Sequence, residues 1–331
     1  MSTILAGDIG GTKCNLALFT SEAERLRPVF QRRLPTRNYA GFESLIPDFL
    51  QQAAAEGVLN TTVDAAGFGL AGVVAEGRLH AENLSWVLDV PALTRSLNLK
   101  NLVLLNDMIA TALSLEKLPE SDFVALNPQA TPEVEATRCV IAAGTGLGEA
   151  ILFWDGKQYR AAAAEGGHAD FAPHNERETE LLSFLRKQLP HVCTEEILSG
   201  RGFRRVHEFL DPSVRHASFE AGGDAASEIA QQGLAGSCGV CSETLTLWSE
   251  IYGAVAGNFA LQTMARGGVY VAGGIATKIL PRLSDGTFLR GFCGQGKLTP
   301  VLKRIPIFVV LNADAPLWGA AYRALASLQP Q

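Results

Sequence analysis

Short apolar runs separated by polar and glycine-rich turns cover most of the chain, and their spacing predicts a mixed α/β protein. Apolar runs, which are typical of buried strands, occur at 3–9, 14–20, 64–74, 101–107, 267–276 and 305–311, and 27–36 is a further candidate. The segment 137–154 contains two such runs with a glycine turn between them. Apolar residues at helical spacing occur at 41–57, 108–118, 178–189, 195–210, 243–265 and 316–328. The polar stretch 217–227 predicts a surface loop.

Two segments share the order strand, glycine turn, strand. The first turn is centred near Gly10 and the second near Gly146, and a third apolar strand ends at Gly273 and Gly274. The chain has 331 residues, which is long for one domain, and the repeat favours two related α/β halves. Glycines let successive backbone N–H groups point at one anion, so we expect phosphate-binding turns rather than plain hairpins. Neither the P-loop pattern nor a strict G-x-G-x-x-G fingerprint is present.

Composition narrows the class of protein. The chain is 47% hydrophobic and 19% charged, which is typical of a large folded core. A net charge of −6 argues against general nucleic-acid binding. No apolar run reaches the roughly 18 residues of a spanning helix, and the N-terminus lacks the basic start of a signal peptide. We therefore expect a cytoplasmic protein that does not act at a membrane.

Six cysteines are scattered along the chain, and only Cys238 and Cys241 form a C-x-x-C pair. A structural zinc site needs four ligands, and no second C-x-x-C or H-x-x-x-H follows this pair. The sequence therefore favours ordinary thiols near the start of a helix.

Acidic residues follow two of the expected strands. Asp8 lies beside the first glycine turn. A carboxylate there can hold Mg²⁺ through water, or it can accept a hydrogen bond from the backbone of its own turn. Asn106 and Asp107 end the strand at 101–107. Asp107 either caps the following helix or accepts a proton from a substrate hydroxyl during phosphoryl transfer.

A second polar group lies further along the chain. Glu165 and His168 bracket two glycines in a stretch that otherwise looks buried, which favours a polar pocket over a lone structural histidine. Carboxylates accept from neighbouring hydroxyls and imidazole donates or accepts, so such a pocket suits a sugar. Glu195 and Glu196 lie at an expected helix start, where acidic residues also favour the helix dipole.

In this combination and order, the motifs resemble those of the bacterial glucokinases in the hexokinase–actin-like ATPase superfamily. The resemblance covers almost the whole chain and is carried by GDIGGT at 7–12, ND at 106–107, AAGTGLG at 142–148, EGGHADFAP at 165–173, EEILSG at 195–200, SCGVC at 237–241 and VAGGI at 271–275. Many family members continue GGTN-x-R, whereas this chain has Lys13, Cys14 and Asn15, which leaves the role of Lys13 open. The cysteine-rich zinc motif of the related ROK group is absent from the sequence.

The resemblance implies a two-lobed actin-like ATPase (ribonuclease H-like) fold with an interlobe cleft. The small lobe would comprise 1–115 plus 314–331 and the large lobe 116–313. The implied activity is ATP-dependent phosphorylation of glucose to glucose 6-phosphate, the first step of glycolysis, with Mg²⁺ and in a possible homodimer. A kinase for another hexose or an amino sugar, and a non-catalytic sugar or nucleotide sensor of the same fold, are the alternatives.

The resemblance also implies roles for individual residues. Asp107 would be the catalytic base, and the hexose ligands would be Asn106, Asp107, Glu165, His168 and Glu195, with Glu196 left on the helix surface. ATP would contact the three turns through Gly7, Asp8, Ile9, Gly10, Gly11, Thr12, Gly144, Thr145, Gly146, Gly273 and Gly274, the last two near the adenosine. Asp8 would hold Mg²⁺ through water.

Overall fold

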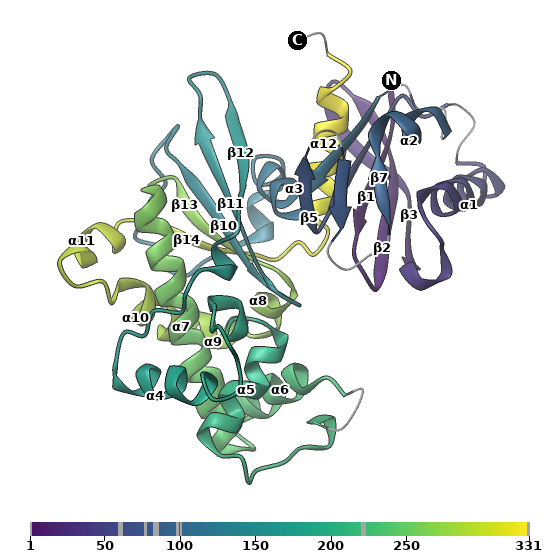
Figure 1. Cartoon of the computed structure of the whole chain (residues 1–331). Coiled ribbons are helices and arrows are strands. Elements are labelled where there is room, and N and C mark those ends of the chain that lie inside the picture. The colour runs from purple at the N-terminus through teal and green to yellow at the C-terminus, as the bar shows by residue number, and fades with distance from the viewer. Residues whose placement is uncertain are drawn as a thin grey trace. The chain divides into compact units, whose positions relative to one another are not determined.

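The computed structural model describes residues 2–58, 62–75, 78–81, 86–96, 99, 101–219 and 223–329. Contacts divide the chain into two compact units, unit 1 with Met1–Pro119 and Asp314–Gln331, and unit 2 with Glu120–Ala313. Each unit is built on its own mixed β-sheet with helices (Figure 1). No helix in the described ranges combines the length and the apolar character needed to cross a bilayer.

Unit 1 contains a five-stranded sheet in the order β3-β2-β1-β4-β8. Its strands are β1 (Ser2–Ile9), β2 (Lys13–Glu22), β3 (Arg25–Pro35), β4 (Ala65–Leu70) and β8 (Leu102–Asn106). The first three strands form an antiparallel meander, whereas β1, β4 and β8 run parallel. A smaller antiparallel sheet comprises β5 (Gly72–Ala75), β6 (Arg78–Ala81) and β7 (Val87–Asp89).

Helices cover both faces of the five-stranded sheet. Alternate residues of each strand point to opposite faces, so each strand contributes apolar side chains to both cores. Leu5 and Ile9 of β1 join the core cluster that contains the apolar face of α1 (Phe42–Ala55). Ile4 and Ala6 face the other cluster, which contains α12 (Ala315–Ala326) and part of α3 (Asp107–Ser114). The yellow C-terminal helix α12 therefore packs on the purple strand β1 within this unit (Figure 1). The short elements η1 (Thr36–Asn38) and α2 (Val90–Ser96) complete the unit.

Unit 2 contains a six-stranded sheet in the order β12-β11-β10-β13-β14-β9. Its strands are β9 (Phe123–Ala125), β10 (Arg138–Ala143), β11 (Leu147–Trp154), β12 (Tyr159–Ala164), β13 (Gly268–Ala272) and β14 (Ile307–Val310). As in unit 1, a hairpin, β10–β11, lies beside a parallel neighbour, β13. The expected repeat of strand, turn and strand is thus present in both units.

The long helix α7 (Gly239–Thr263) is the centre of unit 2. Three helices pack against it, namely α5 (Gly200–Leu210), α6 (Ala225–Ala235) and α10 (Thr287–Cys293). In Figure 1, α4, α5 and α6 gather near one end of α7. The helices of this unit are α4 (Glu176–Leu185), α5 (Gly200–Leu210), α6 (Ala225–Ala235), α7, α8 (Gly274–Lys278), α9 (Leu280–Ser284), α10 (Thr287–Cys293) and α11 (Thr299–Leu302). Single 3-10 turns occur at η2 (Glu120–Asp122), η3 (Gly166–His168), η4 (Thr194–Glu196), η5 (Ala217–Phe219) and η6 (Gly296–Leu298).

The α/β fold class is confirmed, and the predicted boundaries of several elements are wrong. The helix expected from 195 begins at Gly200, after the 3-10 turn η4. The strand expected over 267–276 ends at Ala272, because Gly273 has a φ of 87°, which breaks the strand before α8. The expected loop at 217–227 contains the start of α6, where the side chain of Asp224 accepts from Ser227 N and caps the helix. Residues 220–222 of that loop lie outside the described ranges.

Candidate active site

In unit 1, the parallel strands β1, β4 and β8 end at one edge of the sheet. Ile9 is in register with Leu70, and Leu70 is in register with Asn106. The first glycine turn follows β1 at this edge, and Asp107 follows β8. The carboxyl ends of parallel strands are where open α/β sheets commonly bind ligands, so the topology brings the predicted phosphate turn and the predicted catalytic acid to one edge.

The first glycine turn is a short exposed loop whose two ends are held by hydrogen bonds. Gly10 N donates to Lys13 O at 3.0 Å, and Gly11, Thr12 and Lys13 are exposed. The buried side chain of Thr36 donates to Gly10 O at 2.7 Å, while Thr36 N donates to Thr12 O at 3.0 Å. Thr36 therefore clamps both sides of the turn from η1. Sequence reasoning did not find this residue, because nothing local in its stretch points to a turn 24 or more residues upstream.

Two of the residues predicted to bind ATP are packed inside unit 1. Ile9 is 2% exposed and belongs to the core. Gly7 is buried, and a Cβ there would lie 2.6 Å from Phe68 Cδ1. Strand packing therefore favours a glycine at this position of GDIGGT, because a side chain there would have to displace the ends of Phe68 and Leu16. A role of Gly7 and Ile9 toward a nucleotide remains a prediction that involves their backbone alone.

Asn106 rather than Asp107 caps α3. Its Oδ1 accepts from Met108 N at 2.9 Å and from Ile109 N at 3.2 Å, and its Nδ2 donates to Gly72 O at 3.2 Å. Of the two alternatives for Asp107, the helix cap is wrong, because Asp107 is the first helical residue and Asn106 already supplies the cap. Asp107 Oδ1 accepts from Met108 N at 2.9 Å. The cap fixes the start of α3 and hence the position of the Asp107 backbone.

Carboxylates concentrate at this edge of unit 1. The pKa of Asp8 is raised to about 6, first by burial and then by the neighbouring charges of Asp107 and Asp314, against a lowering by Lys13. A carboxyl group with this pKa is only partly protonated at neutral pH. The site thus holds excess negative charge that a cation would neutralise.

Asp314, which precedes α12, is the most firmly held of these acids. It accepts from Asn15 Nδ2 at 2.8 Å, from Gln31 Nε2 at 3.0 Å and from Arg33 at 2.9 Å. Burial alone would raise the pKa of Asp314, but these hydrogen bonds and the Arg33 charge outweigh it and lower the pKa. Asp314 is therefore a fixed anion, and sequence reasoning missed it because its partners are almost 300 residues away.

In unit 2, the second and third glycine turns meet at one sheet edge. Strands β10 and β13 are parallel, with Ala142 in register with Ala272. A Cβ on Gly273 would lie 2.7 Å from Ala143 O, and the φ of 87° already favours glycine there. Thr145, Gly273 and Gly274 are exposed. The predicted phosphate and adenosine turns are thus neighbours.

Glu195 lies directly against the second glycine turn. Its Oε2 accepts from Leu147 N at 3.0 Å, and its Oε1 accepts from Arg201 at 2.5 Å. A Cβ on Gly146 would lie 2.3 Å from Glu195 Oε2, so the glycine makes this contact possible. Glu196 pairs with Arg205 and also lies 3.5 Å from the Arg201 guanidinium, so the bond from Leu147 N to Glu195 is what distinguishes the two acidic neighbours.

Glu165 precedes the 3-10 turn η3 and His168 is its last residue, and η3 packs against η4 and β11. His168 N donates to Glu165 O at 3.1 Å, and Thr194 N, next to Glu195, donates to Ala169 O at 2.9 Å. Both predicted sugar ligands are exposed, so the expectation that they lie in a buried stretch is wrong. The alanines before them form β12, an edge strand of the sheet, and leave the turn open to solvent.

Glu149 is a buried acid that sequence reasoning missed. It is 4% exposed on β11, in register with Ala164, and a Cβ on Gly166 would lie 1.9 Å from its Oε2. Burial raises the pKa of Glu149 to about 7, with a further contribution from the charge of Glu165. The only sequence signal was a single acid in an otherwise apolar strand.

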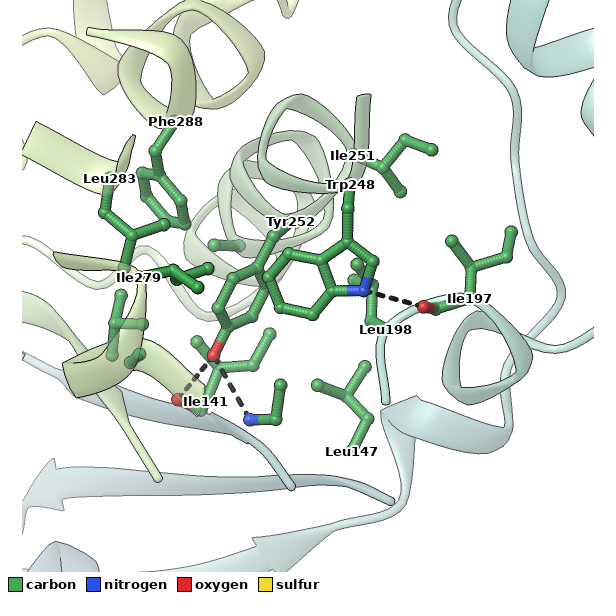
Figure 2. Packing of buried hydrophobic residues seen from close by; sticks show 14 of the residues in the cluster. Ile141, Leu147, Ile197, Leu198, Trp248, Ile251, Tyr252, Ile279, Leu283 and Phe288 are labelled. Atoms are coloured by element: carbon green, nitrogen blue, oxygen red, sulfur yellow. Dashed lines mark hydrogen bonds between the residues drawn. The ribbon is translucent and has the colours of Figure 1, made fainter. Parts of the chain in front are cut away.

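Two side chains of helix α7 hold both segments of the unit 2 site, the second glycine turn and η4. The hydroxyl of Tyr252 donates to Ile141 O at 3.2 Å and accepts from Ala143 N at 3.3 Å, immediately before the second turn. Trp248 Nε1 donates to Ile197 O at 2.8 Å, just after Glu195 and Glu196 (Figure 2). One turn of a rigid helix therefore sets the positions of the glycine turn and of η4.

Comparisons with known proteins cover nearly the whole chain. The sequence profile of the family described as Glucokinase matches residues 5–327. A glucokinase from Nostoc punctiforme is 35% identical, over 97% of this chain and 98% of that protein. The crystal structure of a glucokinase from an Antarctic psychrotroph superposes with a TM-score of 0.84 at 26% identity, covering 98% of this chain and 99% of that one. A ROK family glucokinase from Streptomyces griseus in complex with glucose and AMPPNP has the same fold, with a TM-score of 0.66 at 21% identity and coverage of 98% and 100%.

Proposed function

This chain belongs to the glucokinase family and is an ATP-dependent sugar kinase that phosphorylates glucose, and we propose that Asp107 is its catalytic base. The observation that carries this proposal is the edge of unit 1. There, Asp107 starts a capped helix and lies near enough to Asp8 to raise the pKa of that carboxyl. The exposed glycine turn lies at the same edge.

In this proposal, the 6-hydroxyl of glucose attacks the γ-phosphorus of ATP. Asp107 accepts the hydroxyl proton as the new oxygen–phosphorus bond forms, and ADP leaves with the electrons of the broken bond. Asn106 acts as a positioning residue, since its side-chain oxygen already caps α3 and its amide bonds Gly72. We therefore assign Asn106 to holding Asp107 in place, with any contact to the sugar as a second role.

The phosphates of ATP are assigned to the exposed backbone of the glycine turns. Gly11 and Thr12 in unit 1 and Thr145 and Gly146 in unit 2 would offer turn N–H groups in sequences with little side-chain bulk. Gly10 and Gly144 shape the two turns, because their N–H groups donate to Lys13 O at 3.0 Å and to Gly146 O at 2.8 Å. Gly273 and Gly274 would adjoin the adenosine. The parallel register that joins the second and third turns supports a shared role for them in nucleotide binding.

The donor set in unit 1 fits Mg²⁺. Mg²⁺ prefers oxygen ligands and usually keeps several waters, and it binds proteins through one or two carboxylates. Asp8 would hold the ion, with Asp107 as its neighbour, whereas Asp314 is committed to three hydrogen-bond donors. When bound, the ion supplies charge neutralisation for the phosphates of ATP.

The sugar hydroxyls are assigned to the acidic and imidazole groups of unit 2. Glu195, Glu165 and His168 lie on two 3-10 turns that are joined by backbone hydrogen bonds. Carboxylates that accept from adjacent hydroxyls would distinguish glucose from sugars that lack or invert a hydroxyl. The fixed bond from Leu147 N to Glu195 supports a preorganised ligand.

Release of ADP, measured with and without glucose, tests the proposal. We expect glucose-dependent ADP release by the unmodified chain and its loss in Asp107→Asn, with glucose still binding by calorimetry. Glucose binding without glucose-dependent ADP release in the unmodified chain would instead favour a sensor. A panel with mannose and N-acetylated amino sugars in the same assay tests the assignment to glucose.

A further inference from the structure

Four metal-ligating side chains meet in unit 2, away from the groups assigned to the kinase reaction. They are His207 on α5, His216 just before η5, and Cys238 and Cys241 at the start of α7. One ligand atom from each lies within 4.8 Å of every other. The cysteine pair looked isolated in the sequence. The fold adds two histidines that precede it in the chain, which gives a set of four ligands.

The distances between these side chains are close to those of a metal site. His216 Nε2 lies 3.1 Å from Cys241 Sγ and 3.7 Å from Cys238 Sγ. Zinc bonds of about 2.3 Å to sulfur and about 2.0–2.1 Å to nitrogen place tetrahedral ligand atoms roughly 3.3–3.8 Å apart. Small side-chain rotations would therefore bring the four atoms into coordination.

His207 supplies a second, independent observation. Its side chain is fully buried, and neither ring nitrogen has a hydrogen-bond partner among the residues that the structure describes. Its ring lies against the rings of His216 and Phe219, with centroids 5.4 and 5.0 Å apart. A buried imidazole without partners is costly, and a bound metal ion satisfies one nitrogen directly.

The second histidine has the support that metal ligands commonly have. His216 Nδ1 lies 3.7 Å from Glu228 Oε1 on α6, while its Nε2 faces the two sulfurs. The other oxygen of Glu228 accepts from Ser218 N at 3.1 Å, which fixes the carboxylate. A carboxylate behind a ligating histidine sets the ring orientation and strengthens the ligand.

We propose that His207, His216, Cys238 and Cys241 form a structural zinc site. Two thiolates and two imidazoles are a set that zinc takes in closed tetrahedral sites, and four protein ligands leave no open position for catalysis. The ion would tie the C-terminal half of α5 and the segment before η5 to the N-terminus of α7. Its role is therefore to stabilise the helical part of unit 2, and it is independent of the proposed base Asp107.

Metal analysis of the purified full chain tests this proposal. We expect about one zinc per chain in the unmodified protein and a loss of at least roughly tenfold in the double variant Cys238→Ser, Cys241→Ser. Cys293→Ser and His174→Gln serve as matched controls, because one removes a half-buried lone thiol and the other an exposed imidazole. Both controls should retain the metal.

Cobalt replacement in the unmodified protein avoids dependence on variants that fail to fold. After zinc removal, added Co²⁺ should give the visible ligand-field bands of a tetrahedral ion and thiolate-to-cobalt charge-transfer bands. X-ray absorption of the zinc protein should show two sulfurs at about 2.3 Å and two nitrogens at about 2.0–2.1 Å. A chain purified in the presence of zinc with no bound ion, or with a shell of oxygen and nitrogen alone, would overturn the proposal.

Discussion

The two units present their candidate chemistry at equivalent places and hold it in opposite ways. Each has a hairpin with a glycine turn beside a parallel strand. In unit 1, the acids beside the turn perturb one another, and the pKa of Asp8 rises to about 6. In unit 2, the acid beside the turn is bonded into it, because Glu195 accepts from Leu147 N and from Arg201.

This difference separates two tasks. Crowded carboxylates attract a cation and favour proton uptake, which are the needs of phosphoryl transfer. A carboxylate held by backbone and guanidinium donors keeps its position, which is the need of hydroxyl recognition. The comparison therefore predicts that changes in unit 1 lower kcat and changes in unit 2 raise KM for the sugar.

The largest expected effect comes from Asp107→Ala. Loss of the proposed base should lower kcat by more than about 100-fold while glucose binding stays near that of the unmodified chain. Steady-state kinetics and calorimetry of glucose binding measure the two quantities. Glu43→Gln is the matched control, because Glu43 is an exposed acid in the first turn of α1. Turnover by Asp107→Ala at a near-normal rate would remove Asp107 from the reaction.

Glu195→Gln tests the other half of the comparison. A charged hydrogen bond to a sugar hydroxyl is worth about 1.5–3 kcal/mol, so KM for glucose should rise about 10- to 100-fold with a smaller change in kcat. Glu196→Gln is the neighbouring control, because its side chain pairs with Arg205. If both variants changed kcat alone, the division of tasks between the units would be wrong.

Gly146→Ala sharpens the same point without removing a carboxylate. The new Cβ would lie 2.3 Å from Glu195 Oε2, so the flexible acid must leave its place beside Leu147 N. We expect KM for glucose to rise about 10-fold with a stability loss of only about 1 kcal/mol. Gly144→Ala is the stability control, since a Cβ there meets nothing within 4 Å, and its thermal midpoint should stay unchanged.

Much of the fold was readable from the sequence, because buried parallel strands are near-continuous apolar runs. The strands around Gly10 and Gly146 were expected, and both hairpins are present. The start of α6 was missed, since polar and glycine residues before its Asp224 cap look like a loop. The strand predicted over 267–276 is too long, because apolar residues continue into α8.

Local sequence placed Asp8 and Asp107 at strand ends but gave no information about partners that are distant in the chain. Asp314 reaches Asn15 across 299 residues, and the clamp by Thr36 joins η1 to the first turn. The two histidines near Cys238 arrive from α5 and from the segment before η5. Such contacts depend on how helices pack, which no motif of a few residues encodes.

The variant Glu149→Gln tests how the buried acid of unit 2 affects the pH dependence of stability. Its pKa of about 7 lies above the ordinary 4.5, so the native state holds the proton more tightly. The stabilisation is present below pH 4.5 and is lost as the pH rises through about 7. Glutamine mimics the protonated form, so at pH 8 the variant should be more stable by about 1–3 kcal/mol. Denaturation at pH 5 and pH 8 measures this, with exposed Glu180→Gln as the control; equal stabilities at pH 8 would contradict the raised pKa.

Asp8→Asn should have a smaller effect on stability, because the group lies nearer to solvent. Its pKa of about 6 against an ordinary 3.8 means that protonation stabilises the native state below pH 3.8 and that this contribution is lost as the pH rises through about 6. The variant should gain about 1–2 kcal/mol at pH 7 after allowance for solvent screening. Added Mg²⁺ distinguishes Asp8 from Glu149. If Asp8 holds the ion, added Mg²⁺ stabilises the unmodified chain at pH 7 and removes the advantage of Asp8→Asn, whereas the advantage of Glu149→Gln stays the same. An equal response of both variants to Mg²⁺ would show that the acids of the two units do not differ in cation binding.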